Sequence, residues 1–460
     1  MQTIILSFLL YCQNFFIVYI SDKFFEPNIF EYLLILTILI LVQTSKYKTI
    51  ILILWQILYC IEFLFISYFN STIKPYDIKL FFTHSNEIFE SFINLYHIFI
   101  PSIIFCTIMV IFIIKLSHKI NISRYFIIFI LSMLIFFQPK TQNDLSLNLI
   151  QNIFNISFLA NEPLNNSNKL NPHHKINNLN IVLVVAESMR YKNLSLFGYK
   201  KNTTPYLNNL KTDLFYKTVY TKATNTDVSI PLLINGANDF ENIDISNNLF
   251  VLASNNNFYT SFISTQSPKS LQYIMPYLSD SINNIKILNS KNDEDLYFYL
   301  KKDYQNNSNN FTVLQMTGEH SPYSYYPKSF NIFTNNSIEN NYNNSIRYSD
   351  YVLNLIIQYI KKQDKPTIFI CTSDHGELLG ENNQYGHNRF EKDIYTVPLI
   401  IYTHNIKIDK NILKNINSHQ DIYTFIKYLL GYSQTINFVS APYRINGTMQ
   451  TGEDSYILVN

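Results

Sequence analysis

Cysteine is scarce in this sequence, and its placement excludes a fold held together by disulfides. Only four cysteines occur among 460 residues, and Cys12, Cys60 and Cys106 lie in a strongly apolar N-terminal region. Cys371 is therefore alone in the polar remainder of the chain. No disulfide can form within that remainder, whatever its redox compartment.

A large excess of charge of either sign is also absent. The formal net charge is +2 at pH 7, and no basic stripe with interleaved aromatic residues runs through the chain. We therefore expect no nucleic-acid partner.

The composition changes abruptly near Lys140. Residues 1–138 are rich in Ile, Leu, Phe and Tyr with few charges, whereas Asn, Ser, Asp and Lys dominate the rest. A chain of this length divides into at least two domains. We expect a transmembrane domain over residues 1–140, an amphipathic bridging helix and linker over 141–179, and a globular domain over 180–460.

Five apolar stretches are long enough, or nearly long enough, to cross a bilayer: residues 3–20, 29–43, 49–69, 95–115 and 124–139. The second and fifth are shorter than the about 20 residues that a span usually needs. A buried helical core of a soluble protein is the alternative, but five such stretches would require a very large partner surface. The first stretch lacks a preceding basic residue and a small-residue cleavage site, so it is predicted to be an anchor and not a signal peptide.

The distribution of charge between the spans favours a cytoplasmic N-terminus. The inner loops would then carry Lys46, Lys48, Lys115, Lys119 and Arg124. Lysines of the outer loops are diluted by acidic residues, as the positive-inside rule requires. An odd number of spans places everything after Lys140 outside the membrane.

Two further segments are predicted to lie on the membrane surface. Residues 70–94 and 145–159 mix apolar and polar residues in the manner of interfacial helices, and residues 161–179 are typical of a linker. Glu62 lies inside the third apolar stretch, where it would either face a polar cavity or reach the interface.

Short apolar runs alternating with amphipathic helices predict an α/β domain after Asn180. Ile181–Ala186 and Thr367–Cys371 are continuous apolar runs, as expected for central parallel strands. Thr312–Gln315 and Val397–Tyr402 are further candidate strands. Amphipathic helices are expected over the two segments Ser345–Lys362 and Asp421–Leu430.

Polar side chains follow two of these strands directly. Glu187 comes after the first, and Asp374 and His375 come after the strand Thr367–Cys371. Open α/β sheets bind ligands at the carboxyl ends of their strands, and Zn²⁺ accepts histidine nitrogen and carboxylate oxygen together. The pattern predicts a divalent-metal site, although helix-capping residues would leave a similar pattern.

These residues belong to longer motifs. They are Glu187-Ser-Met-Arg190, Gly198-Tyr199 with Thr203-Thr-Pro205, Thr224-Asn-Thr226-Asp-Val-Ser229-Ile-Pro231, Gly318-Glu-His320-Ser-Pro322, Ser373-Asp-His-Gly-Glu377 and Tyr385-Gly-His387. In this order, and after five apolar stretches, they resemble the signatures of bacterial phosphoethanolamine transferases within the alkaline-phosphatase and sulfatase superfamily. Ser418-His419 with Asp421-Ile422 is similar to a late signature of that family.

The resemblance implies a role for each matching residue. Glu187, Asp374 and His375 would bind zinc, with Thr226 as nucleophile and fourth ligand; Thr224 and Ser229 are nearby hydroxyls that compete for this role. His320 and His387 would handle the donor, the acceptor or a second metal ion. Lys269 would bind the donor headgroup.

The resemblance also implies a sulfatase-like fold with a mainly parallel central sheet and an activity. Thr226 would accept phosphoethanolamine from phosphatidylethanolamine, forming a phospho-threonine intermediate, and pass it to a lipopolysaccharide acceptor or another envelope glycan. Zinc coordination would activate the hydroxyl. The protein would be a monomer in the bacterial inner membrane, with its catalytic domain in the periplasm.

Several residues depart from the family pattern or are expected to serve the structure. Asp227 and Glu319 stand where smaller or uncharged residues are usual, which leaves the acceptor open. Glu377 and Arg190 are predicted to support the site without binding metal. His173, His174 and His419 are expected to be surface, linker or structural residues.

Three alternative functions stay open at this point. A phosphoglycerol transferase of the lipoteichoic-acid-synthase type has the same general organisation. A hydrolase of the superfamily is disfavoured because no Cys/Ser-x-Pro-x-Arg motif lies near Thr226. A catalytically inactive scaffold is disfavoured because every candidate ligand is retained.

Overall fold

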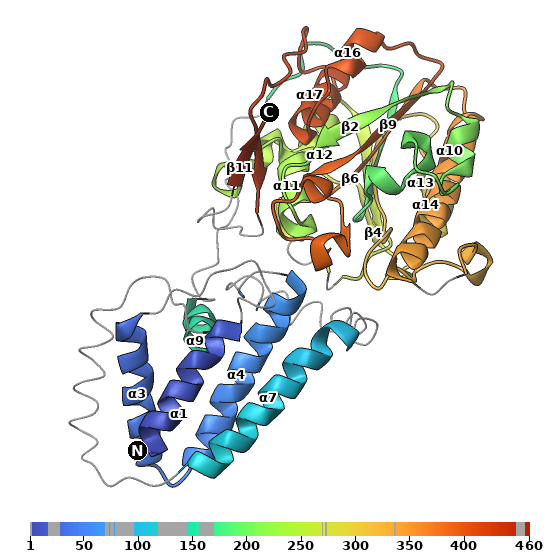
Figure 1. Ribbon diagram of the computed structural model, residues 1–460. Helices are drawn as coiled ribbons and strands as arrows, with labels where there is room; N and C mark the ends of the chain where they lie inside the picture. Colours follow the sequence, from blue (N-terminus) through green and yellow to red (C-terminus); the bar gives the residue numbers. More distant parts are fainter. Residues whose placement is uncertain are drawn as a thin grey trace. The chain divides into compact units, whose positions relative to one another are not determined.

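The computed structural model describes residues 2–16, 28–69, 73, 78, 96–117, 145–155, 170–268, 270–271, 274–334, 337–447 and 456–460. The chain divides into two compact units, Met1–Leu159 and Ala160–Asn460. Figure 1 shows helices alone in the first unit and a sheet flanked by helices in the second.

The described part of the first unit contains the helices α1 (Gln2–Cys12), α3 (Ile29–Gln43), α4 (Lys48–Phe69), α7 (Tyr96–Leu116) and α9 (Leu145–Asn155). They fall on four of the five predicted apolar stretches and on the predicted surface segment 145–159. The helix in the first stretch is shorter than predicted, because a 3-10 turn, Gln13–Phe16, follows α1. The fifth stretch, 124–139, lies outside the described residues, as does all of 70–94 except residues 73 and 78.

Two of these helices are long and apolar enough to cross a membrane, Lys48–Ser67 and Phe99–Leu116, and Ile29–Gln43 is a shorter apolar helix. Leu6, Leu34 and Ile113 are buried between helices. Large apolar residues such as Phe8 and Ile104 stay exposed. An apolar outer surface of this kind requires lipid or a partner to cover it.

Glu62 has a structural contact inside this first unit. It is fully buried, and its Oε1 accepts the backbone N–H of Ile73 at 2.9 Å. Nearby, the Gln56 amide donates to Gln13 Oε1, and the Tyr59 hydroxyl donates to the carbonyl of Gln13. Buried polar groups are generally hydrogen-bonded. This hydrogen bond connects the Glu62 carboxylate to Ile73, beyond the end of α4.

The second unit is built on a seven-stranded sheet of order β2-β9-β6-β1-β5-β3-β4. The strands are β1 (Asn180–Ala186), β2 (Leu214–Tyr220), β3 (Phe258–Ser264), β4 (Asn284–Ile287), β5 (Asn309–Gln315), β6 (Thr367–Ser373) and β9 (Thr396–His404). β2, β6, β1, β5, β3 and β4 run in the same direction, and β9, between β2 and β6, runs in the opposite one. The predicted, mainly parallel central sheet is confirmed. The four predicted strands correspond to β1, β5, β6 and β9.

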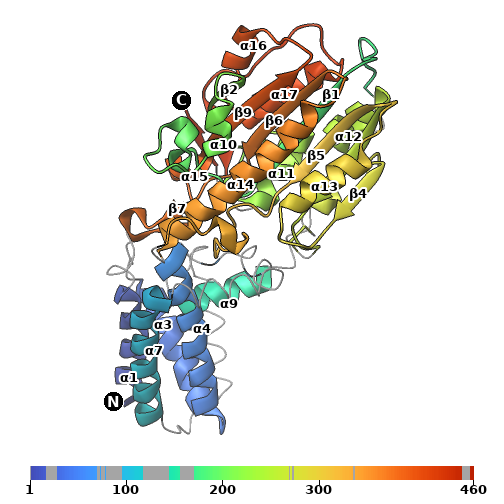
Figure 2. The same ribbon diagram turned by 90° about the vertical axis from the view of Figure 1, so that its right-hand side faces the viewer.

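Helices cover both faces of this sheet (Figure 2). One face packs against α11 (Thr226–Asn235), α12 (Leu249–Asn255), α16 (Lys410–Lys414) and α17 (His419–Leu429). The other packs against α10 (Pro205–Asn209), α13 (Glu294–Asp303) and α14 (Ile338–Ile360). Successive residues of β1 enter opposite layers, Ile181 one and Val182 the other. This alternation explains why the strand is apolar throughout.

The two predicted amphipathic helices are present, and each begins earlier than its apolar pattern. α14 starts at Ile338 because the Ser337 side chain accepts the N–H of Asn340. α17 starts at His419 because Ser418 caps Asp421 in the same way. Capping at the first turn decides a helix start that apolar periodicity cannot locate.

The remaining elements are short. A two-stranded hairpin pairs β10 (Tyr443–Asn446) with β11 (Tyr456–Val459), and another pairs β7 (Leu378–Leu379) with β8 (Tyr385–Gly386). α15 (Lys392–Tyr395) leads into β9. Residues 170–179 of the predicted linker lie along the second unit, where the His173 N–H donates to the carbonyl of Gly431.

Candidate metal centre and its supporting residues

Strand register brings the first two candidate ligands together. In the parallel pair β1 and β6, Ala186 lies opposite Ser373. The next residues, Glu187 and Asp374, therefore leave adjacent strands at the same edge of the sheet. Both side chains are almost completely buried.

Thr226 reaches the same point from a different element. It is the first residue of α11, which follows β2 at this edge of the sheet. Its Oγ1 lies 2.6 Å from Asp374 Oδ2 and 3.1 Å from Glu187 Oε2. Thr224 Oγ1, by contrast, has no hydrogen-bond partner among the described residues, and Ser229 Oγ donates to the carbonyl of Asp374.

His375 completes the group with its Nε2 atom. Nε2 lies 3.1 Å from Thr226 Oγ1 and 3.4 Å from Glu187 Oε1. The Nδ1 atom lies 2.8 Å from the carbonyl of Gly376. A carbonyl can only accept, so Nδ1 carries the proton and Nε2 presents its lone pair. Burial lowers the pKa of His375 to about 4, which keeps the ring neutral.

The two carboxyl groups have opposite pKa shifts. Burial and the nearby Asp374 raise the pKa of Glu187 well above its usual range. Burial alone would raise the pKa of Asp374. His375, the Thr226 hydroxyl and two backbone N–H groups lower it by more, so the pKa lies below its usual value. Two acids this close and this buried are costly without a compensating positive charge.

The separations between His375 Nε2 and the other donor atoms are close to those of a tetrahedral zinc site, whereas Thr226 and Asp374 lie at hydrogen-bond distance from each other. Ligands about 2.0–2.1 Å from a zinc ion lie about 3.3–3.4 Å apart in a tetrahedron. His375 Nε2 lies 3.1 Å from Thr226 Oγ1 and 3.4 Å from both Glu187 Oε1 and Asp374 Oδ2. The shortest separation is 2.6 Å, between Thr226 Oγ1 and Asp374 Oδ2. Glu187, Asp374 and His375 form one possible metal-binding group. A divalent cation would also neutralise the buried acids.

Neighbouring polar side chains orient these donors. Ser188 donates from Oγ to Glu187 Oε1 and from its backbone N–H to Asp374 Oδ1. It holds a positive φ of 57°, a left-handed conformation that is uncommon for serine. His419 lies beneath the site, with Nε2 3.0 Å from the carbonyl of Ser373 and Nδ1 3.4 Å from Ser229 Oγ. It is fully buried, which agrees with its predicted structural role.

Gln266 was missed by the sequence reasoning. Its Nε2 donates to Glu187 Oε2 at 2.9 Å and to the carbonyl of Met316 at 3.1 Å. It follows β3, so the strand-end rule that identified Glu187 could have found it. Lys269, three residues further along the chain and the predicted headgroup-binding residue, lies outside the described residues.

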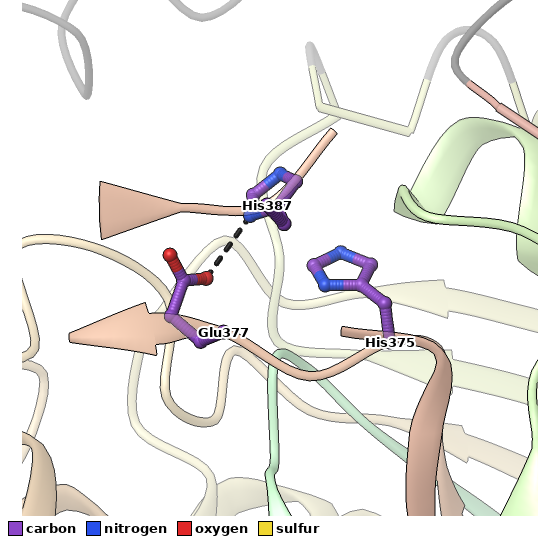
Figure 3. A group of neighbouring side chains, drawn as sticks. All are labelled: His375, Glu377 and His387. Atoms are coloured by element: carbon purple, nitrogen blue, oxygen red, sulfur yellow. Dashed lines mark hydrogen bonds and ion pairs between the residues drawn. The ribbon is translucent and has the colours of Figure 1, made fainter. Parts of the chain in front are cut away.

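A second group of possible metal ligands adjoins the first: His375, Glu377 and His387 (Figure 3). His387 Nδ1 lies 3.0 Å from Glu377 Oε2, and the rings of His375 and His387 are 4.1 Å apart at their centroids. Burial alone would raise the pKa of Glu377, but His387, together with His375 and His320, holds it below its usual value. An ionised Glu377 fixes the proton on His387 Nδ1, so Nε2 is the basic atom.

Arg190 ties this second group to the start of the first strand–helix turn. Its Nη1 donates to the carbonyl of Glu377, and its Nη2 pairs with Glu381 at 2.7 Å and with Asp393 at 3.4 Å. The guanidinium is buried. It therefore connects segments far apart in the sequence, as expected of a supporting residue.

The remaining site residues lie around this centre. His320 is half-buried, with Nδ1 2.8 Å from the carbonyl of Ser321. Glu319 is fully buried and accepts from Ser349 Oγ at 2.6 Å, so its carboxyl contacts α14. Burial raises the pKa of Glu319 to about 8. Asp227 is buried in the first turn of α11.

Comparison with known families gives the broad identity. The profile of the sulfatase family matches residues 179–432, more than half of the chain. The chain belongs to the sulfatase family. This sulfatase-family protein also has curated relatives among phosphoethanolamine transferases, which confirms the resemblance seen in the motifs.

One such relative is the phosphoethanolamine transferase EptA of Helicobacter pylori, 30% identical over 250 residues. That match covers 48% of this chain and 47% of EptA, so the chain spans about half the length of the curated relatives it matches. The solved integral membrane protein EptA of Neisseria meningitidis has the same fold. Its TM-score is 0.68 at 17% identity, over 95% of this chain and 96% of that one.

A third structure is the periplasmic domain of EptC from Escherichia coli in complex with zinc. It superposes with a TM-score of 0.53 at 19% identity, over 65% of this chain and 96% of that domain. At these identities the two structural likenesses describe the fold alone.

Proposed function

We propose that this sulfatase-family protein transfers phosphoethanolamine from phosphatidylethanolamine to a lipopolysaccharide acceptor, a lipid A phosphate or a core sugar. The observation that carries the proposal is the convergence of Thr226 Oγ1 on Glu187, Asp374 and His375 at 2.6–3.3 Å. Curated relatives of this chain are phosphoethanolamine transferases, which supports the transferred group. The acceptor rests on the resemblance of the motifs.

In this proposal Glu187, Thr226, Asp374 and His375 would hold one zinc ion, and His387 Nε2 would be available as a ligand of a second. Zinc, when bound, would lower the pKa of the Thr226 hydroxyl and neutralise charge on the phosphoryl group. Ser188 and Gln266 keep the Glu187 carboxylate oriented. His419 holds the Ser373 and Ser229 segments beneath it.

The chemistry proceeds in two displacements. The Thr226 oxygen forms a bond to phosphorus, the bond from phosphorus to the diacylglycerol oxygen breaks, and phosphoethanolamine stays on Thr226. Nε2 of His387 or His320 accepts the proton of the Thr226 hydroxyl and delivers it to the leaving diacylglycerol oxygen. An acceptor hydroxyl or phosphate oxygen then attacks the same phosphorus, the bond from phosphorus to the Thr226 oxygen breaks, and any proton on the acceptor oxygen passes through the same histidine to Thr226.

Both histidines are suited to this proton transfer. Nδ1 of His387 faces a carboxylate and Nδ1 of His320 faces a backbone carbonyl. Each ring is therefore held with Nε2 as its basic atom. We assign the donor headgroup to Lys269, His320 and His387.

The proposed setting is a bacterial inner membrane. In this setting residues 1–140 are a membrane domain with five spans, and residues 141–179 are an amphipathic bridging helix and linker. Residues 180–460 are the periplasmic catalytic domain, and the protein is a monomer. The two apolar helices Lys48–Ser67 and Phe99–Leu116 support membrane insertion. The positive-inside bias of the loops supports the orientation.

The test is donor labelling of the purified full-length protein. Phosphatidylethanolamine labelled in ethanolamine should add phosphoethanolamine to the peptide that contains Thr226, detected by mass spectrometry. Thr226→Ala should abolish this labelling, whereas the neighbouring Thr224→Ala is the matched control and should retain it. Labelling of Thr226→Ala at the wild-type level would reject the nucleophile.

The same experiment separates the principal alternative. Phosphatidylglycerol labelled in glycerol should leave the protein unlabelled. Labelling by this lipid and none by phosphatidylethanolamine would identify a phosphoglycerol transferase. Release of free phosphoethanolamine at the rate of donor consumption, with or without acceptor, would identify a hydrolase.

A further inference from the structure

A polar cavity of about 470 Å³ lies away from the metal centre, lined by one face of α17 and by the loops that follow α11 and α17. Figure 1 labels both helices on the same side of the sheet, and they pack against each other. The cavity falls within the size range of small-molecule sites, about 300–1,000 Å³. Its lining, however, is not the mainly apolar lining of such sites.

Amide and hydroxyl side chains dominate the wall. Asn247, Gln420, Thr424 and Asn437 line it together with the rings of Tyr423 and Tyr432. Each amide offers both donors and an acceptor, and each hydroxyl does the same. Aromatic rings add flat apolar surface with a polar edge. This combination suits a ligand that carries many hydroxyl groups on a partly apolar ring.

Charged ligands fit this wall less well. Lys427 and Asp244 are the cation and the anion among the described lining residues, so their charges largely offset each other. The Lys427 ammonium also lies over the Tyr423 ring, 5.8 Å from its centroid. A neutral polyhydroxylated ligand is favoured over a phosphate or a fatty acid.

One amide atom of the wall has unused hydrogen-bonding capacity. Gln420 Oε1 is buried and has no hydrogen-bond partner among the described residues. A buried acceptor without a donor is costly, so it marks a position where a ligand hydroxyl or water is required.

Contacts within the protein hold the aromatic side chains of the cavity wall in place without a ligand. The Tyr423 hydroxyl donates to the carbonyl of Asn247, and the Tyr432 hydroxyl donates to the carbonyl of Leu252. Gly236, at φ +65°, lets the Tyr423 ring pack against the backbone, where a Cβ atom would lie 2.3 Å from the ring. A preformed wall lowers the entropic cost of binding.

Both helices that carry the cavity begin at the metal centre. Thr226 is the first residue of α11, and His419 is the first residue of α17. The ten residues of α11 separate Thr226 from the cavity-lining Asn235 by about 14 Å along the helix axis. A ligand of several linked rings would span this distance.

We propose that this cavity is a saccharide-binding subsite that holds a sugar of the acceptor while another part of the same acceptor reaches Thr226. The proposal rests on the transferase function proposed above, because it supplies the second substrate of that reaction. The amides bind the sugar hydroxyls, and Tyr423 and Tyr432 frame the ring.

The experiment measures saccharide binding directly, apart from transfer. Saturation-transfer NMR and calorimetry would be run on the full-length protein in detergent. The probe is fully deacylated lipopolysaccharide core oligosaccharide, with maltotriose and inorganic phosphate as separate arms. Gln420→Ala and Asn437→Ala are the test variants, and Asn306→Ala, at an exposed position outside the cavity, is the matched control.

We expect the oligosaccharide to bind the wild type and Asn306→Ala equally and each test variant at least about tenfold more weakly, the effect of losing roughly one hydrogen bond. An unchanged melting temperature would show that the test variants fold. No oligosaccharide binding, equal binding by the test variants, or stronger binding of inorganic phosphate would overturn the subsite. Donor labelling of wild-type Thr226 is scored separately, so a missing subsite and a missing transferase activity are distinguishable.

Discussion

Asn446 donates two hydrogen bonds to the carbonyl oxygen of Lys222, one from its backbone N–H at 2.8 Å and one from Nδ2 at 3.0 Å. Nδ2 also lies 2.8 Å from the carbonyl of Asn238, and the carbonyl of Asn446 accepts the N–H of Thr224. One residue near the C-terminus thus holds the segment that leads into Thr226.

Asn446→Asp should slow donor labelling without removing the metal ligands. The aspartate is nearly isosteric but cannot donate from its side chain, so two hydrogen bonds are lost. Each such loss costs about 1 kcal/mol, so we expect a melting temperature several degrees lower and a labelling rate reduced roughly tenfold. Asn306→Asp is the control. Wild-type rate and stability in Asn446→Asp would mean that this contact does not position the segment.

Replacement of a candidate ligand should release metal. Asp374→Asn and His375→Ala each remove one donor from the tetrahedral group, and zinc affinity should fall by at least about a hundredfold. Elemental analysis of the purified protein measures this. Asp213→Asn, whose side chain is exposed, should retain the wild-type content. Unchanged zinc in both ligand variants would place the ion elsewhere.

Glu377→Gln should weaken turnover more than Tyr323→Phe. The carboxylate fixes the proton on His387 Nδ1, and a neutral amide holds it much less strongly. The Tyr323 hydroxyl donates to the other carboxylate oxygen, Glu377 Oε1. We expect kcat to fall about 10–100-fold in Glu377→Gln and only a few-fold in Tyr323→Phe. Equal kcat values in the two variants would contradict this role, and parallel zinc analysis would reveal whether Glu377 also binds metal.

Lys222 should make stability depend on pH. Burial lowers its pKa from 10.5 to about 7, against the opposing effect of Asp421 and Asp239 and with a small contribution from Arg444. Between these two values the unfolded chain binds a proton that the folded chain lacks, so stability rises with pH.

Lys222→Met removes this titration. The variant's stability relative to wild type should therefore be highest below pH 7 and fall by on the order of 4 kcal/mol by pH 10. Thermal unfolding at several pH values measures the difference. Lys301→Met, at an exposed position, should show a constant difference from wild type. A constant difference in Lys222→Met as well would mean that Lys222 keeps its charge in the folded protein.

Alanine substitutions at two glycines should distinguish the cost of backbone strain from the cost of a steric clash. Gly198 and Gly236 both have positive φ, but an added Cβ meets nothing within 4 Å at Gly198 and the Tyr423 ring at Gly236. Gly198→Ala should cost about 1 kcal/mol from strain alone. Gly236→Ala should cost at least about 2 kcal/mol more, because the ring must move. Similar melting temperatures for the two variants would contradict this difference.

Much of the second unit follows from local sequence patterns. Apolar runs identified β1, β5, β6 and β9 because buried strands need apolar residues on both faces. The position of Glu187, Asp374 and His375 just after two such strands indicated the sheet edge where ligands bind. The antiparallel direction of β9 was not visible, since an apolar run has no direction.

The contacts of Gln266, Ser188 and Glu319 were not visible in the sequence either. Gln266 reaches Glu187 because β3 lies two strands away from β1, a neighbour relation that depends on strand order. Glu319 was singled out only as a departure from the family pattern, and its contact with Ser349 on α14 could not be inferred from that. The direction of a side chain at a strand end depends on the helices that pack beside it.

The sequence by itself determined the order of the motifs, the apolar N-terminal region and three candidate metal ligands, Glu187, Asp374 and His375, because residue type and spacing are local properties. Thr226 was added to them by the resemblance of its motif. Tertiary structure alone decided that Asn446 holds the segment before Thr226, that Glu377 orients His387, and that a polar cavity lies beyond α11. Each of these depends on residues that are distant in the chain and meet only when strand order and helix packing are set.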